Sequence, residues 1–210
     1  MRERHYRVYA EACKQAGLTP LDANGYWRRR RSGASTFDLI SPGDPAEADT
    51  FRRAWLASIE HPDLVLRDQV IPGAEEALRQ LGAAGYQLVI ATLRRSRPAL
   101  LTQVQSLGLT QWFAEVVSPE AVDAGDKGAI ITRAGYTSDD VVIGDSESDV
   151  AAARSLSIAS VCVTTGVRSP AYLRKLKPTR VIPSIRELPS VLPEMGAPKM
   201  GRRLADEAVA

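Results

Sequence analysis

The spacing of apolar residues changes about a third of the way along the chain. In the first part they recur at helical spacing, as Tyr9 and Cys13 do on one face of the first expected helix. Further on, short apolar runs alternate with helical segments, a pattern typical of a parallel sheet covered by helices. We therefore expect an all-helical part over 1–65, an α/β part over 66–192 and a flexible tail over 193–210.

The elements of the α/β part follow from these runs and from the glycines and prolines between them. Strands are expected over 86–91, 113–117, 140–143 and 159–163. Helices are expected over 74–85, 96–108, 127–135 and 147–156. The first helix of the chain, over 3–17, has no good capping residue before it, because Met1 and Arg2 offer no side-chain acceptor for its free amides. The pattern predicts a doubly wound parallel sheet with a small helical accessory part.

Composition and charge limit the number of domains, the partners and the cellular compartment that we expect. A chain of 210 residues with 44% hydrophobic content can bury one core and a small second lobe. The net charge of +2 requires neither nucleic acid nor an anionic membrane as partner. The run Arg28–Arg31 is either a solvated helical face or a means of steering an anionic substrate. Cys13 and Cys162 lie far apart, and there is no apolar run of about 18 residues, so we expect a soluble, cytoplasmic protein.

Candidate chemistry lies where the expected strands end, because parallel sheets bind ligands at the carboxyl ends of their strands. Thr92 follows the strand over 86–91, and Lys127 opens a helix. Gly144-Asp145-Ser146-Glu147-Ser148-Asp149 follows the strand over 140–143 and concentrates three carboxylates.

Each of these residues has two interpretations. Asp145 and Asp149 are the hard oxygen ligands that Mg²⁺ prefers, but Ser146 and Asp149 are equally suited to capping the next helix. Thr92 is either a phosphate-oxygen donor or an ordinary turn residue. Lys127 is either a fixed positive charge beside a phosphoryl group or a solvated surface lysine.

Taken in order, strand–Thr92, Lys127 at a helix start, and strand–Gly-Asp-x-x-x-Asp at Asp145 and Asp149 resemble the second, third and fourth motifs of the haloacid-dehalogenase-like (HAD-like) hydrolase superfamily. The helical part resembles the helical cap of phosphoglycolate-phosphatase-like members. This resemblance implies a Rossmann-like core and Mg²⁺-dependent hydrolysis of a small phosphorylated metabolite. It implies that Thr92 binds the phosphoryl group, Lys127 stabilises it, Asp145 ligates Mg²⁺ and Asp149 is a ligand or a neighbour of one.

The chain departs from the family pattern in two places. Leu93 and Arg94 follow Thr92 where many relatives have an asparagine. No apolar strand ending in Asp-x-Asp is present, although that motif carries the family's nucleophile and general acid-base; the nearest imitation, 36–40, has only Asp38. We expect the motif to lie upstream of Met1. The first strand is normally central, so two strands should have unpaired edges, and the chain should be destabilised, inactive or paired with a second copy.

A second hypothesis is that the chain is a non-catalytic relative that binds a phosphorylated ligand or a protein partner. The absent nucleophile favours this hypothesis, whereas the retained Thr92, Lys127, Asp145 and Asp149 favour catalysis. Dehalogenases need no Mg²⁺, so the carboxylates from Asp145 to Asp149 also argue against a dehalogenase.

Overall fold

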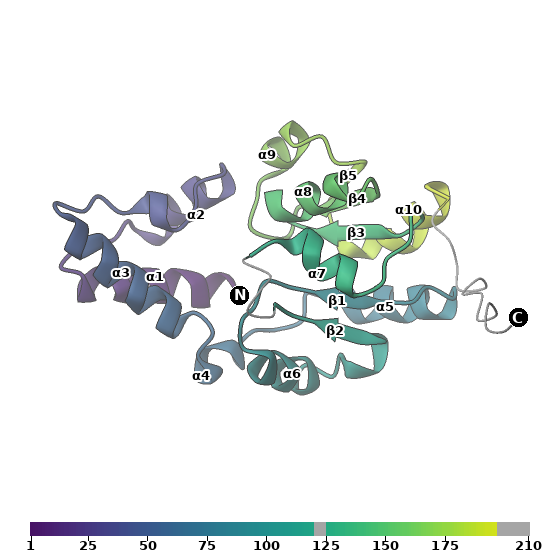
Figure 1. Ribbon diagram of the computed structural model, residues 1–210, viewed down its shortest axis with the longest axis horizontal. Helices are drawn as coiled ribbons and strands as arrows, with labels where there is room; N and C mark the ends of the chain where they lie inside the picture. Colours follow the sequence, from purple (N-terminus) through teal and green to yellow (C-terminus); the bar gives the residue numbers. More distant parts are fainter. Residues whose placement is uncertain (120–124, 197–210) are drawn as a thin grey trace, which may run out of the picture.

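The computed structural model describes residues 1–119 and 125–196. Figure 1 shows a helical part at one end of the molecule and, beside it, an α/β part whose strands lie among helices. In the described residues, no helix is long and apolar enough to cross a membrane.

The helical part follows the chain through short connections. Its elements are α1 (Arg2–Gln15), α2 (Ala23–Arg31), η1 (Phe37–Leu39), α3 (Pro45–Ser58) and α4 (Pro62–Val65). Asp22 and Asp44 cap the starts of α2 and α3 by accepting hydrogen bonds from the backbone of Gly25 and Glu47. As the sequence predicted, the start of α1 has no side-chain cap.

Aromatic rings hold the helical part together. Tyr9 of α1, Tyr26 of α2 and Phe51 of α3 are fully buried. The ring centroids of Tyr9 and Tyr26 are 4.6 Å apart, and Phe51 meets Tyr9 edge-on at 6.0 Å. Such pairs stabilise a core beyond the area they bury, typically by about 0.5–1.5 kcal/mol each.

The strands form two separate parallel sheets. One pairs β1 (Val89–Ala91) with β2 (Glu115–Val117), and the other has the order β3-β4-β5, with β3 (Val141–Gly144), β4 (Ala159–Val163) and β5 (Arg180–Ile182). Within residues 1–119 and 125–196, β1 has no strand on its other edge, and neither does β3. Both edges therefore present backbone groups that a further strand could satisfy.

Burial distinguishes the paired strands from the unpaired edges. In β4, which has a partner on each side, Val161 and Cys162 are fully buried. All of β3 is only partly buried, and Val89 of β1 is 39% exposed. Strands at the centre of a doubly wound sheet are normally buried on both faces, so β1 and β3 behave as edges.

Helices cover both faces of the three-stranded sheet. On one face Val161 and Ile182 pack with Leu81 of α5 (Ala74–Ala83) and with Leu188 of α10 (Leu188–Glu194). On the other, Cys162 packs with Val150 of α8 (Glu147–Ser155) and Leu173 of α9 (Pro170–Lys175). This alternation along β4 is that of a doubly wound α/β fold.

The remaining elements complete the two layers. They are α6 (Arg97–Ser106), η2 (Thr110–Trp112), α7 (Lys127–Arg133) and η3 (Ile185–Glu187). Helix α7 contacts β1 and β2 of the two-stranded sheet. It also contacts α8, which packs on β3 and β4 of the three-stranded sheet, so α7 bridges the two sheets.

Several elements differ from the sequence prediction. The strand expected over 86–91 begins only at Val89, and α9 and β5 were not predicted as elements. Pro193 and Glu194, expected to belong to a flexible tail, instead complete α10, whose Leu192 is buried against the core. The rest of that predicted tail, 197–210, lies outside the described residues.

Candidate active site

The four predicted site residues occupy the positions expected of them along the fold. Thr92 directly follows β1, Lys127 is the first residue of α7, Asp145 directly follows β3 and Asp149 lies in the first turn of α8. Three of them, Lys127, Asp145 and Asp149, come together through hydrogen bonds.

Asp149 is the centre of this cluster. Its side chain is 3% exposed, and its Oδ1 pairs with Nζ of Lys127. Its Oδ2 accepts hydrogen bonds from the backbone of Asp145 at 3.0 Å, the backbone of Ser146 at 2.9 Å and Oγ of Ser146 at 2.6 Å. Ser146 and Asp149 form a capping box at the start of α8, so the capping interpretation of Asp149 is confirmed.

Asp145 is a partly buried carboxylate with a single protein donor in the described residues. Its Oδ2 accepts from the backbone N–H of Val167 at 2.5 Å. Burial raises the pKa of Asp145 above its ordinary value; the hydrogen bond from Val167 lowers it, and the nearby Asp149 carboxylate adds to the rise. No described residue donates to its Oδ1, which leaves that oxygen available to a ligand.

Two glycines make room for the two aspartates. A Cβ on Gly144 would lie 2.0 Å from Cγ of Asp149, and a Cβ on Gly166 would lie 1.9 Å from Oδ2 of Asp145. Side chains cannot approach backbone so closely where a Cβ is present. The chain therefore has glycine at the two points where these carboxylates lie against it.

Thr92 lies at the end of the other sheet. Its backbone N–H donates to the carbonyl of Val117, and its Oγ1 accepts from the backbone of Arg94 at 3.3 Å. Among the described residues no hydrogen bond joins Thr92 to Lys127, Asp145 or Asp149. The lack of such bonds in the described residues follows the division between the sheets, since β1 and β3 are not paired.

The helical part contacts the α/β part at the carboxyl ends of two strands. After β1, the carboxylate of Glu60 accepts from the backbone of Arg95 and, at 3.0 Å, of Ser96. After β4, Nη1 of Arg31 donates to the carbonyl of Gly166 at 3.0 Å. The helical part thus lies over the edge where Asp145 and Thr92 are found.

Arg168 is a functional candidate that sequence analysis missed. Its side chain is buried, and its Nε donates to Oε2 of Glu147 at 2.7 Å. The same guanidinium donates from Nη1 to the carbonyl of Arg30, and to that of Ala34 at 3.0 Å, both in the helical part. No sequence motif surrounds Arg168. The arginines of the run Arg28–Arg31 differ in exposure: Arg28 and Arg29 are exposed, whereas Arg31 is partly buried and contacts Gly166.

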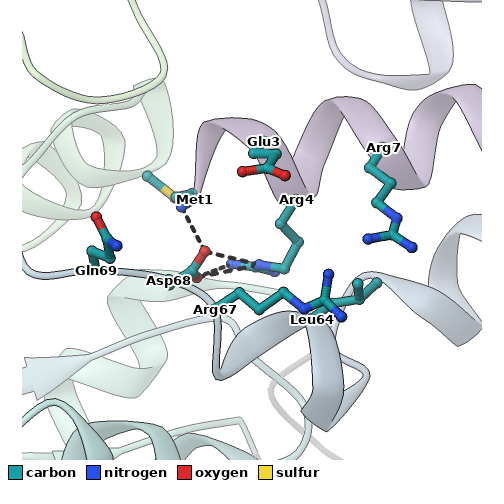
Figure 2. A pocket seen from close by; sticks show the side chains of 8 residues that line it. All are labelled: Met1, Glu3, Arg4, Arg7, Leu64, Arg67, Asp68 and Gln69. Atoms are coloured by element: carbon teal, nitrogen blue, oxygen red, sulfur yellow. Dashed lines mark hydrogen bonds and ion pairs between the residues drawn. The ribbon is translucent and has the colours of Figure 1, made fainter.

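A pocket of about 220 Å³ lies where α1 begins, beside the connection from α4 to α5 (Figure 2). None of the four predicted site residues lines it. Asp68 lies at its edge and accepts from Arg4 at 2.8 Å, from the amino group of Met1 and from Gln103 of α6. This cluster ties the start of α1 to the α/β part, and we assign it a structural role.

The donor set at Asp145 fits a Mg²⁺ ion in part. Mg²⁺ takes one or two protein carboxylates and keeps several waters, and Asp145 supplies a partly buried carboxylate with one oxygen available. Across residues 1–119 and 125–196, no group of three His, Cys, Asp or Glu side chains is placed to hold a metal ion. Direct ligation by Asp149 would require its carboxylate to leave Lys127 or the capping amides.

The Lys127–Asp149 pair and Asp145 lie at the carboxyl end of a strand in a parallel α/β core, which is where proteins of this fold class bind their ligands. The family model described as haloacid dehalogenase-like hydrolase matches residues 2–156, and a second, described as HAD-hydrolase-like, matches residues 128–188. The chain belongs to the haloacid dehalogenase-like hydrolase family.

Solved structures show the same fold. A predicted phosphatase from Clostridium acetobutylicum is 20% identical, with 91% of each chain covered and a TM-score of 0.73. A haloacid dehalogenase-like hydrolase from Streptococcus pneumoniae is 18% identical, with 90% of each chain covered and a TM-score of 0.72. A predicted phosphoglycolate phosphatase from Haemophilus somnus is 18% identical, covering 90% of this chain and 91% of its own, with a TM-score of 0.69. No curated protein matches the chain.

Proposed function

We propose that this protein takes part in Mg²⁺-dependent hydrolysis of a small phosphate monoester. The observation that carries the proposal is the cluster of Lys127, Asp149 and Asp145 at the carboxyl end of β3. It places a positive charge, a carboxylate that orients it and a carboxylate with an available oxygen within one site. A capping function alone would account for Asp149 but not for the partly buried Asp145, which accepts a hydrogen bond only from Val167 among the described residues.

Each side chain has a defined task in this proposal. Lys127 holds a positive charge where the phosphoryl oxygens would lie, and Asp149 fixes its direction. Thr92, whose Oγ1 already accepts from Arg94, has its own O–H left to donate to a phosphoryl oxygen. Asp145 would hold Mg²⁺, which when bound supplies charge neutralisation for the transferring phosphoryl group.

The nucleophile is proposed to be an aspartate on a further strand that lies between β1 and β3. Both strands have an unpaired edge in the described residues, and both are less buried than β4. A parallel strand in that place would join the two sheets into one and end beside both Thr92 and Asp145. Its carboxylate would attack phosphorus, the ester P–O bond would break, and the alcohol would leave after gaining a proton; water would then hydrolyse the aspartyl-phosphate and release inorganic phosphate.

The helical part is proposed to act as a cap over the site, with its division from the α/β core near residue 65. Glu60 and Arg31 contact the loops that follow β1 and β4, so the cap covers the strand ends where a substrate would lie. An enclosed site of this kind suits a small phosphorylated metabolite.

The test is hydrolysis of 4-nitrophenyl phosphate with and without Mg²⁺. This chain is compared with a version extended at its N-terminus by translation of the in-frame codons before that of Met1. We expect activity in the extended version only, dependent on Mg²⁺ and lost in Asp145→Asn. Absence of activity in the extended version, with its fold intact, would contradict the proposal.

A second function, binding of a phosphorylated ligand without catalysis, is favoured by the absence of a three-residue metal cluster in the described part of the chain. Hydrolysis distinguishes the two functions, because both a phosphatase and a non-catalytic relative can bind inorganic phosphate. A non-catalytic protein should bind inorganic phosphate through Lys127 in both versions and should hydrolyse nothing in either.

A further inference from the structure

The loop from Thr164 to Ser169, between β4 and α9, lies between the cap and Asp145. Its residues contact Asp145, helix α8 and the cap. No motif in the sequence marks this loop.

The first contact is with the carboxylate. The backbone N–H of Val167 donates to Oδ2 of Asp145 at 2.5 Å and is the only donor to that carboxylate among the described residues. Gly166 lies so close that a Cβ there would overlap Asp145. The position of this loop therefore sets the direction of the Asp145 side chain.

The second contact is through Arg168, whose side chain is 4% exposed. It forms a fork-to-fork pair with Glu147, two residues beyond Asp145, and it donates to the carbonyls of Arg30 and Ala34 in the cap. One buried cation thus holds the start of α8 and the end of α2 together. A lysine could not form this geometry, because it lacks the planar fork.

The third contact runs from the cap to the loop. Arg31 donates to the carbonyl of Gly166 at 3.0 Å, and its own carbonyl accepts from the backbone N–H of Ser169 at 2.9 Å. The cap and the loop therefore hold each other on both sides of Val167.

We propose that Arg168 and Arg31 are positioning residues that couple docking of the cap to the geometry of Asp145. When the cap is docked, its contacts fix the loop, and the loop presents the Val167 N–H to the Asp145 carboxylate. When the cap lifts, the loop loses the contacts with Arg31 and Ala34, and Asp145 loses its orientation. The proposal rests on the proposed function in one respect, namely that Asp145 binds Mg²⁺.

A purely electrostatic role and a positioning role of the arginines predict opposite changes in Mg²⁺ affinity when either arginine is removed. Loss of a nearby positive charge should strengthen binding of a divalent cation at Asp145. Loss of positioning should weaken it. The sign of the change in Mg²⁺ affinity therefore separates the two explanations.

The first measurement is hydrogen exchange of two backbone amides by NMR, in the absence of metal. The Ser169 amide reports docking of the cap, and the Val167 amide reports the bond to Asp145. In Arg31→Gln, whose side chain is only partly buried and leaves the core intact, both amides should exchange about tenfold faster. Arg29→Gln, an exposed arginine on the same helix, is the control and should change neither.

The second measurement is Mg²⁺ binding by calorimetry. Arg168→Gln and Arg31→Gln should each bind Mg²⁺ several-fold more weakly than the unchanged protein, and Arg168→Lys should not restore the affinity. Arg174→Gln, an exposed arginine on α9, is the control.

Two results would overturn the coupling: tighter Mg²⁺ binding in Arg31→Gln, or faster exchange at Ser169 with no change at Val167. If the unchanged protein binds no Mg²⁺, the proposed metal role of Asp145 fails. The exchange rates then still decide whether cap docking positions the Asp145 carboxylate.

Discussion

Nζ of Lys127 pairs with Oδ1 of Asp149, while the other oxygen of that carboxylate caps the start of α8. The lysine is thereby fixed to the backbone that immediately follows β3. The Lys127 side chain is 17% exposed, and that of Asp149 is 3% exposed, so the pair is shielded from solvent on one side. One carboxylate thus serves the fold and the site together.

Asp149→Ala should destabilise the protein by roughly 3 kcal/mol, because it leaves a partly buried lysine unpaired and removes a helix cap. Chemical denaturation checks this value. Lys127→Met is the matched variant, since it removes the pair and keeps the cap. It should therefore cost less than Asp149→Ala, and an equal or greater loss would contradict the dual role of Asp149.

The sequence placed all four site residues correctly along the fold, because each follows a predicted strand or opens a predicted helix. It could not decide between capping and metal binding for Asp149, since both use the same residue types at the same spacing. The structure shows the cap directly. The sequence gives no sign of Arg168, because a single arginine in a loop belongs to no periodic pattern or motif. Its partners Glu147 and Ala34 are brought near it only by the fold.

The limits of the fold prediction have similar physical causes. The long, amphipathic first helix and the β4 run were predicted nearly to the residue, because their apolar patterns are strong. The strand Arg180–Ile182 was missed because it is short and begins with an exposed arginine. The last helix was missed because its prolines suggested a loop; burial of Leu188 and Leu192 outweighs that local preference.

Asp145→Asn should stabilise the protein at neutral pH. Burial raises the pKa of Asp145 above the value of 3.8 expected when unfolded, so the ionised carboxylate destabilises the folded state at neutral pH. The sign follows from linkage: the advantage of asparagine should be present above the raised pKa and should vanish as the pH falls below 3.8. Asparagine can still accept from Val167, which preserves the loop contact.

Thermal unfolding of both proteins between neutral pH and acid checks this dependence. Mg²⁺ should stabilise the unchanged protein and leave Asp145→Asn unaffected. An asparagine variant that is less stable than the unchanged protein at neutral pH would show that the carboxylate is better satisfied than its surroundings suggest.

His5 should make the protein lose stability in mild acid. Burial lowers the pKa of His5 to about 3, and its Nδ1 has no partner in the described residues. Because the unfolded histidine takes up a proton below its value of 6.5 and the folded one does not, stability is full above 6.5 and falls as the pH decreases. The loss should reach about 2 kcal/mol by a pH of roughly 5.

The measurement is the free energy of unfolding against pH for the unchanged protein and for His5→Phe, which keeps a ring beside Trp55. The carboxyl groups titrate equally in the unchanged protein and in His5→Phe, so the difference between the two curves isolates His5. Parallel curves for the unchanged protein and His5→Phe would refute the assignment.

Gly166→Ala should impair the site far more than it impairs the fold. The added Cβ would lie 1.9 Å from Oδ2 of Asp145, so either the carboxylate or the loop that carries Val167 must move. We expect Mg²⁺ binding to weaken by at least about tenfold, the equivalent of losing one strong interaction. Gly82→Ala is the control, because nothing lies within 4 Å of a Cβ placed there and it lies in the last turn of α5. There the substitution should leave Mg²⁺ binding unchanged and stabilise the helix by up to about 1 kcal/mol. If both variants bound Mg²⁺ equally well, the close contact between Gly166 and Asp145 would have no bearing on the metal, and Asp145 would have to reach its ligand by another orientation.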